Sequence, residues 1–157
     1  MNEAARAVAA LKEKRLTLAT AESCTGGLLG KLVTDVAGSS AVYLGGVISY
    51  AYAVKEALLK VDPALLREKG AVCAEVAEQM ACGVRTLLHA DVSLATTGNA
   101  GPGTDEKNPN VGEIFIACAV KSHCTVQKLE LSGNREENRA AACAAAFALL
   151  ERELEEP

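Results

Sequence analysis

Short apolar runs alternate with segments of helical periodicity along most of this chain. Residues 16–21 and 92–97 are apolar and β-branched runs that predict buried strands, whereas residues 75–89 repeat apolar side chains at helical spacing. A helix between two strands returns the chain to the same end of the sheet, so the strands pair in parallel and the helices cover them. The alternation therefore predicts an α/β fold, a three-layer α/β/α sandwich.

The remaining patterns complete this sandwich. Residues 112–120 and 124–131 are strand-like runs joined by a short turn, and they predict a hairpin that adds antiparallel strands to the sheet. We therefore expect a mixed, mostly parallel sheet of about five strands, in a single domain over residues 1–157. The other predicted elements are a strand over residues 47–52 and helices at residues 3–14, 28–33, 55–60, 63–70 and 135–154.

Composition and charge exclude several classes of protein. A net charge of −4 and 3% aromatic residues argue against a nucleic-acid binder, which uses a basic surface and rings that stack on bases. The longest apolar run, residues 140–150, is shorter than the ~20 residues of a membrane-spanning helix. The charged N-terminus is unlike a signal peptide. We therefore expect a cytoplasmic protein with no nucleic-acid or membrane partner.

The six cysteines and two histidines lack the spacing of a zinc site. In a reducing cytosol, we expect most thiols to be free and to pack as small apolar groups. Cys24 differs because it lies in a Gly-rich turn before a predicted helix, where the helix dipole can lower the pKa of a thiol and activate it as a nucleophile. No histidine lies near Cys24 in the sequence. We expect no metal ion and no other cofactor.

Three segments of small and polar residues follow predicted strands, at residues 23–27, 50–55 and 97–103. The carboxyl ends of parallel strands meet at one edge of a sheet, where open α/β sheets bind ligands. The hydroxyls and N–H groups of residues 23–27 suit a phosphate or carboxylate, or they only cap the helix. The glycines of residues 97–103 let N–H groups approach a developing oxyanion, or they form a plain connection. Neither a Walker A loop nor a GxGxxG motif is present.

Candidate catalytic side chains lie within and between these segments. Ser39 and Ser40 follow a glycine, and Tyr50 and Lys55 come ten and fifteen residues after Ser40. A buried lysine can act as the base that activates a serine, and a nearby tyrosine can relay a proton. An exposed helical lysine and a half-buried strand tyrosine are the simpler alternative. Arg139 lies one helical turn beyond another arginine, and this pair either clamps a phosphate or is solvated.

A series of motifs, in order along the chain, resembles the C-terminal domain family of the competence/damage-inducible protein CinA. These motifs are AESCTGG, GSS, GGVISYAYAVK, GAVCAEVAEQMACG, TGNAGPG and NVGEIFIA. The family includes stand-alone nicotinamide-nucleotide amidases. The resemblance therefore implies hydrolysis of the carboxamide of nicotinamide mononucleotide to nicotinate mononucleotide and ammonia, in pyridine-nucleotide salvage. It also implies an α/β/α fold, a homodimer and a reaction without a metal ion.

The resemblance also implies roles for individual residues. Ser40 corresponds to the catalytic serine, Lys55 to its base and Tyr50 to an assisting group, with Ser23 as the alternative nucleophile. The expected substrate-binding residues are Ser23, Thr25, Gly26, Gly27, Ser39, Thr97, Gly98, Asn99, Gly101 and Arg139.

The chain departs from the family pattern in segments next to the expected site. Asn99 stands where the family usually has Ile, Ala51 and Tyr52 stand where it has Ser-Asn, and residues 107–112 replace KPVG. These departures keep a second function open, a non-catalytic nucleotide-binding or partner-binding module. A hydrolase that uses Cys24 as its nucleophile is a third interpretation, which the resemblance does not support.

Overall fold

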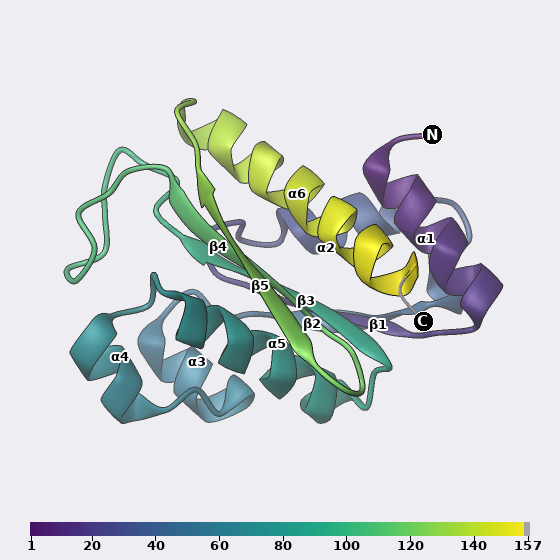
Figure 1. Cartoon of the computed structure of the whole chain (residues 1–157), viewed down its shortest axis with the longest axis horizontal. Coiled ribbons are helices and arrows are strands. Elements are labelled where there is room, and N and C mark those ends of the chain that lie inside the picture. Colours follow the sequence, from purple (N-terminus) through teal and green to yellow (C-terminus); the bar gives the residue numbers. More distant parts are fainter. Residues whose placement is uncertain (156–157) are drawn as a thin grey trace.

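A five-stranded sheet with the strand order β2-β1-β3-β4-β5 runs through the structure, a computed structural model that describes residues 1–155 (Figure 1). Strands β1 (Leu18–Glu22), β2 (Tyr43–Ile48) and β3 (Val92–Gly98) are parallel. Strands β4 (Glu113–Ala119) and β5 (Cys124–Glu130) form an antiparallel hairpin on the β3 side. The predicted α/β fold and the mixed sheet are confirmed.

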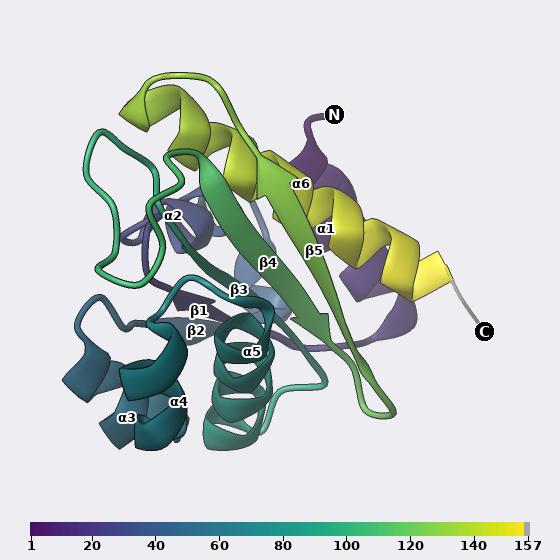
Figure 2. The same cartoon turned by 60° about the vertical axis from the view of Figure 1, so that its left-hand side comes forward.

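Helices cover both faces of this sheet (Figures 1 and 2). Each layer buries its own apolar cluster against the sheet, and the parallel strands β1 and β3 are buried on both faces. One layer contains α1 (Glu3–Lys14), α2 (Leu28–Thr34) and α6 (Arg135–Glu155); the other contains α3 (Tyr52–Leu59), α4 (Pro63–Lys69) and α5 (Ala74–Leu88).

The helix limits follow local signals in the sequence. Asp62 caps α4 by accepting a hydrogen bond from the Ala64 N–H at 2.9 Å, with Pro63 as the first helical residue. In α5, Val76, Met80 and Val84 recur every fourth position, and all three are buried against the sheet. Such an apolar stripe stabilises a helix mainly through its packing on the sheet.

The second strand begins and ends four residues earlier than predicted, at Tyr43 and Ile48. Gly45 and Gly46 weaken the strand pattern, because glycine is unfavourable inside a strand. Here the close approach of β1 requires Gly46, since a Cβ at this position would overlap Thr20. Residues 49–51 consequently form the connection after β2, and Tyr52 begins a helix instead of ending a strand.

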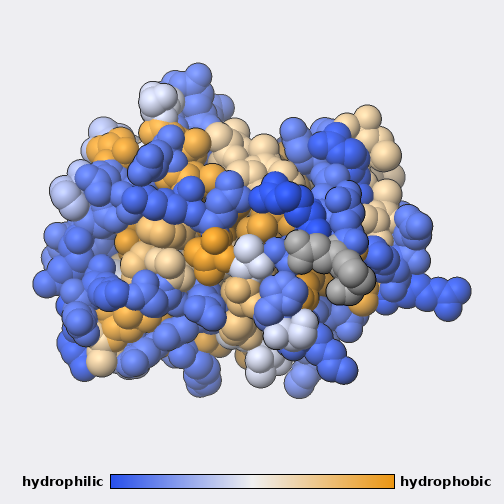
Figure 3. Space-filling model, in the orientation of Figure 1, coloured by the Kyte–Doolittle hydropathy of each residue, from blue (hydrophilic) through white to orange (hydrophobic). Residues whose placement is uncertain are grey.

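Hydrophilic residues cover most of the face seen in Figure 3. Apolar side chains emerge along its middle, between α6 and α5, where the edge strand β5 lies (Figures 1 and 3). Among the helices of residues 1–155, none combines the length and apolar character needed to cross a membrane.

Candidate active site

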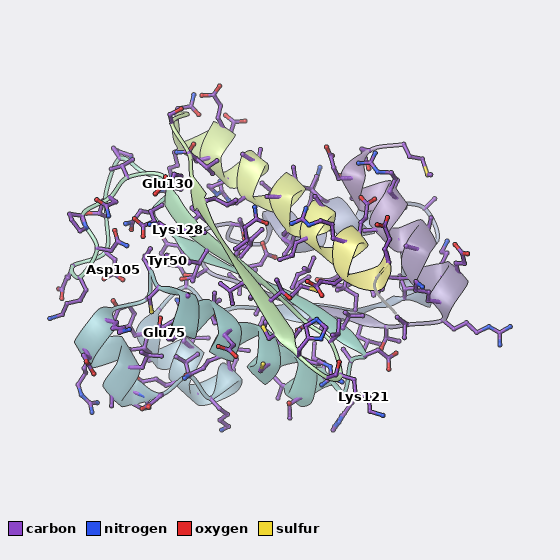
Figure 4. The ribbon with its side chains drawn as sticks, viewed as in Figure 1. Tyr50, Glu75, Asp105, Lys121, Lys128 and Glu130 are labelled. Atoms are coloured by element: carbon purple, nitrogen blue, oxygen red, sulfur yellow. The ribbon has the colours of Figure 1, made fainter. Side chains whose placement is uncertain are left out.

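A cavity of about 660 Å³ lies beyond the carboxyl ends of β1 and β3. All three segments that follow the parallel strands contribute to it, as the topology predicts. In Figure 4, Tyr50 and Asp105 lie at this end of the sheet, and Lys121 of the β4–β5 turn lies at the other. Residues that line the cavity include Ser23, Cys24, Tyr50, Tyr52, Lys55, Thr97, Gly98, Asn99, Ala100, Asp105, Glu106 and Arg135.

The central contact of the cavity joins Lys55 to Ser23. The Lys55 side chain is fully buried, and its Nζ lies 2.8 Å from Ser23 Oγ. The same nitrogen donates to the backbone carbonyls of Ser49 at 2.6 Å and Tyr50 at 3.1 Å. Two of the three hydrogen-bonding directions of Lys55 Nζ are occupied by these carbonyls, and the third points to the serine hydroxyl.

Burial shifts the protonation equilibrium of this lysine. Removal from water lowers the pKa of Lys55 to about 8, against weaker opposing effects of Cys24 and Asp105. A neutral Lys55 can keep its two N–H bonds to the carbonyls and accept the Ser23 O–H with its lone pair. The arrangement therefore suits proton abstraction from Ser23.

A buried carboxylate, which the sequence analysis did not single out, fixes the turn that carries Ser23. Glu22 Oε1 accepts hydrogen bonds from the Gly27 and Leu29 N–H groups at 3.1 and 2.8 Å. Its other oxygen, Oε2, accepts from the Gly30 N–H at 3.1 Å. Carboxylates satisfy the free N–H groups at the start of a helix. The glutamate directly before a Gly-rich turn and a predicted helix was therefore the sequence signal for this role.

The rest of this turn has a structural role. The buried Thr25 hydroxyl donates to Glu22 Oε1 at 2.6 Å and lies 2.7 Å from the Thr96 hydroxyl. Gly26 and Gly27 adopt positive φ angles of 56° and 107°, which favour glycine. None of Thr25, Gly26 and Gly27 lines the cavity, although all three were predicted to bind substrate.

Arg135 and Arg139, in the first two turns of α6, have different positions. Arg139 donates to the backbone carbonyls of Cys24 at 3.1 Å and Thr25 at 2.8 Å, so it holds the turn in place and does not line the cavity. Arg135 lines the cavity and donates to the Gly101 carbonyl at 2.8 Å. Of this predicted phosphate clamp, the structure therefore brings Arg135 rather than Arg139 to the cavity.

The loop after β3 is organised by Asn99. Its side-chain Nδ2 donates to the carbonyls of Asn108 and Asn110, both at 3.1 Å, and its Oδ1 accepts from the Asp105 N–H at 2.9 Å. The Thr97 hydroxyl also has a partner within the protein, since it donates a hydrogen bond to the backbone carbonyl of Ala71 at 2.8 Å. Both residues line the cavity, as does Gly98, whereas Gly101 does not.

The structure does not bring together Ser40 and Lys55, which we predicted as nucleophile and base. Ser39 and Ser40 belong to a short 3-10 turn (η1, Ser39–Ala41) at the amino end of β2, and Lys55 follows its carboxyl end. The neighbouring Gly38 packs against Lys12 of α1. The length of β2 separates the two groups, and the alternative serine, Ser23, occupies the position next to Lys55.

Two other sequence expectations concern the cysteines and metal ions. Burial raises the pKa of the Cys24 thiol to about 12, so the thiol is protonated at neutral pH and is a poor nucleophile. Within residues 1–155, no three histidine, cysteine or carboxylate side chains are grouped so as to hold a metal ion.

Over nearly its whole length, the chain is similar in sequence to known proteins. Residues 2–154 match the family model described as the CinA C-terminal domain. A CinA-like protein of Geobacter sulfurreducens is 47% identical over 91% of the chain, and a putative competence-damage inducible protein of Caldanaerobacter subterraneus is 44% identical over 92%. The chain spans about a third of the length of these curated relatives, 35% in both cases.

Solved structures match the whole fold. A CinA superfamily protein from Klebsiella pneumoniae superposes with a TM-score of 0.94 at 31% identity, covering 98% of this chain and 96% of its own. The competence/damage inducible protein CihA from Agrobacterium tumefaciens gives a TM-score of 0.92 at 33% identity, covering 98% and 94%.

Proposed function

This chain belongs to the CinA C-terminal domain family, and on that premise we propose that it hydrolyses the carboxamide of nicotinamide mononucleotide. The products are nicotinate mononucleotide and ammonia. The observation that carries the proposal is the 2.8 Å contact between Ser23 Oγ and the fully buried amine of Lys55. Amide hydrolysis needs a nucleophile, a base for it and donors for an oxyanion, and this contact supplies the first two.

In the proposed reaction, Ser23 Oγ attacks the carboxamide carbon while its proton moves to the neutral amine of Lys55. The Lys55 ammonium then gives this proton to the leaving nitrogen, the C–N bond breaks, and ammonia departs from an ester on Ser23. A water molecule attacks the ester carbon and loses a proton to Lys55, which returns it to Ser23 Oγ as nicotinate mononucleotide leaves. The serine and the lysine end in their starting forms.

Two backbone N–H groups are candidates for stabilising the oxyanion. Cys24 follows the nucleophile directly, and Ala100 belongs to the loop after β3; both line the cavity. Within residues 1–155, neither N–H donates a hydrogen bond to another residue, so both are free for a substrate oxygen. Donors of this kind act in the transition state, and loss of one typically costs about a hundredfold or more in rate.

The substrate phosphate needs a cationic group at the same cavity. Arg135 begins α6 and has only its Nη1 donor in a hydrogen bond within residues 1–155, to the Gly101 carbonyl. Its remaining donors are therefore free to form the paired hydrogen bonds that guanidinium groups make with phosphates. Arg135 thus supports a nucleotide, rather than free nicotinamide, as the substrate.

The test is ammonia release from nicotinamide mononucleotide by the purified chain, with Ser23→Ala, Lys55→Ala and the matched control Ser40→Ala. We expect the rate of ammonia release to fall about a thousandfold or more in Ser23→Ala and Lys55→Ala, in the range seen when a nucleophile or its base is removed. The Ser40→Ala control should release ammonia at the rate of the parent. Full activity of Ser23→Ala, or loss only in Ser40→Ala, would contradict the proposed site. Nucleotide binding without turnover by the parent would instead indicate a non-catalytic binding module.

A further inference from the structure

The cavity is bordered by a tyrosine and a carboxylate that the proposed reaction does not use. Tyr52 begins α3, and Asp105 lies in the loop between β3 and β4. The Tyr52 hydroxyl lies 2.7 and 2.6 Å from the two Asp105 oxygens, and both residues line the cavity. This hydrogen bond joins the loop to α3 at the lining of the cavity. Figure 4 labels Asp105 of this loop and Tyr50, which precedes α3.

Neutral donors surround the Asp105 carboxylate. The Ala71 N–H donates to it at 2.9 Å and the Lys107 N–H at 3.2 Å, in addition to the Tyr52 hydroxyl. Partial burial raises the pKa of Asp105, but these hydrogen bonds, together with a weaker effect of the Lys55 charge, outweigh it and lower the pKa below its usual value. No ion pair includes Asp105 in the described part of the chain. The carboxylate is therefore a fixed negative charge at neutral pH.

Asp105 also determines the state of Tyr52. Burial, together with the Asp105 carboxylate, raises the pKa of Tyr52 to about 12, so the phenol remains protonated and continues to donate. A phenol that donates to a carboxylate is polarised, which increases the electron density of its ring, and an electron-rich ring face attracts cations. The half-exposed Tyr52 ring is thus held as an electron-rich wall of the cavity.

Opposite charges enter the cavity from the two sides of the sheet. Arg135 begins α6 in one helical layer, and Tyr52 begins α3 in the other, where the loop that carries Asp105 is hydrogen-bonded to it. Nicotinamide mononucleotide has a matching distribution, with an anionic phosphate and a quaternary, positively charged pyridinium ring. Because Arg135 suits the phosphate, the wall formed by Tyr52 is the complementary surface for the ring.

We propose that the ring of Tyr52 packs against the pyridinium cation of the substrate, and that Asp105 is a positioning residue that orients and polarises Tyr52. This inference rests on the proposed function and adds a selectivity to it. The site prefers an amide on a cationic ring to the same amide on a neutral ring, because only the cation gains from the electron-rich wall.

The experiment compares the binding of nicotinamide mononucleotide with that of its reduced form, whose dihydropyridine ring is neutral. Calorimetry on the Ser23→Ala chain measures both affinities without turnover, and their ratio is the selectivity. Adding Tyr52→Leu should lower this ratio about tenfold, and Asp105→Asn about threefold, within the range of cation–π contacts. Tyr52→Phe keeps the ring but loses the hydroxyl that Asp105 polarises, so it should lower the ratio about as much as Asp105→Asn and less than Tyr52→Leu. Glu68→Gln removes an exposed charge outside the cavity and should change nothing.

The outcomes separate this inference from the proposed function. An unchanged ratio in Tyr52→Leu and Asp105→Asn, with melting temperatures close to the parent's, would overturn the role of the pair. A ratio that falls as expected while the parent releases no ammonia would support cation recognition and refute the hydrolase. If the Ser23→Ala chain bound neither nucleotide, both ideas would be wrong. The ratio also excludes a merely structural effect, because a distorted loop weakens both ligands alike.

Discussion

The buried amine of Lys55 predicts an unusual pH dependence of stability. The pKa of Lys55 falls from 10.5 to about 8 on folding, because burial removes the ammonium from water. A shift of this size corresponds to about 3 kcal/mol between the charged and neutral forms. Lys55→Met keeps a long unbranched side chain without a titrating group, so it removes this cost.

The sign follows from where the proton is bound. Below pH 8, both the folded and unfolded chains hold the Lys55 proton, and the folded chain bears the full cost of a buried charge. Between pH 8 and 10.5, only the unfolded chain holds it, so the free energy of unfolding of the parent rises with pH relative to that of Lys55→Met. The difference between the two proteins should therefore change by about 3 kcal/mol in favour of the parent.

Urea unfolding at pH values from 7 to 10 measures this difference. Subtracting Lys55→Met from the parent cancels the titration of the cysteines and tyrosines that both proteins share. Lys121→Met, which removes an exposed lysine from the β4–β5 turn, is the control and should give a difference that is nearly independent of pH. A flat difference for Lys55→Met as well would refute a desolvated Lys55, and with it the base of the proposed mechanism.

Three further predictions concern the supporting residues. Glu22→Gln replaces a carboxylate oxygen by a donor that faces the N–H groups of its turn, so urea unfolding should show a loss of about 3 kcal/mol; a loss under about 1 kcal/mol would contradict the role of Glu22. Arg135→Ala should raise KM for the nucleotide about tenfold with little change in melting temperature, whereas Arg139→Ala should mainly lower the melting temperature; the reverse pattern would exchange their roles. Cys24→Ala should keep its activity in the ammonia assay, since a thiol with a pKa of about 12 is protonated, and its inactivity would reopen a cysteine mechanism.

The place of the site could be predicted from the sequence more reliably than its contacts. Three Gly- and Ser-rich segments follow parallel strands, and parallel pairing brings them to one edge of the sheet whatever their side chains do. The cavity is accordingly lined by residues of all three segments, among them Ser23, Tyr50, Lys55 and Thr97. The role of Glu22 was missed, although a glutamate before a Gly-rich turn was visible in the sequence.

Ser40 is closer than Ser23 to Lys55 in the sequence, but the fold brings Ser23 to Lys55. Ser40 precedes Lys55 by 15 residues and Ser23 precedes it by 32, yet β2 lies between Ser40 and Lys55 and keeps them at opposite ends of the strand. Ser23 directly follows the neighbouring strand β1, which is parallel to β2, so the carboxyl ends of both strands bring Ser23 and Lys55 together. Strand direction, rather than sequence distance, decides the pair.

What the sequence alone determined was the alternation of strands and helices, and with it the parallel sheet and the edge that carries the site. Only the tertiary structure decided that Lys55 is buried against Ser23, that Arg135 rather than Arg139 lines the cavity, and that Tyr52 meets Asp105. Periodicity is local and is visible in any short window of residues. A contact between side chains, and the pKa that burial gives to one of them, depends on elements that are distant in the chain and become neighbours only after folding.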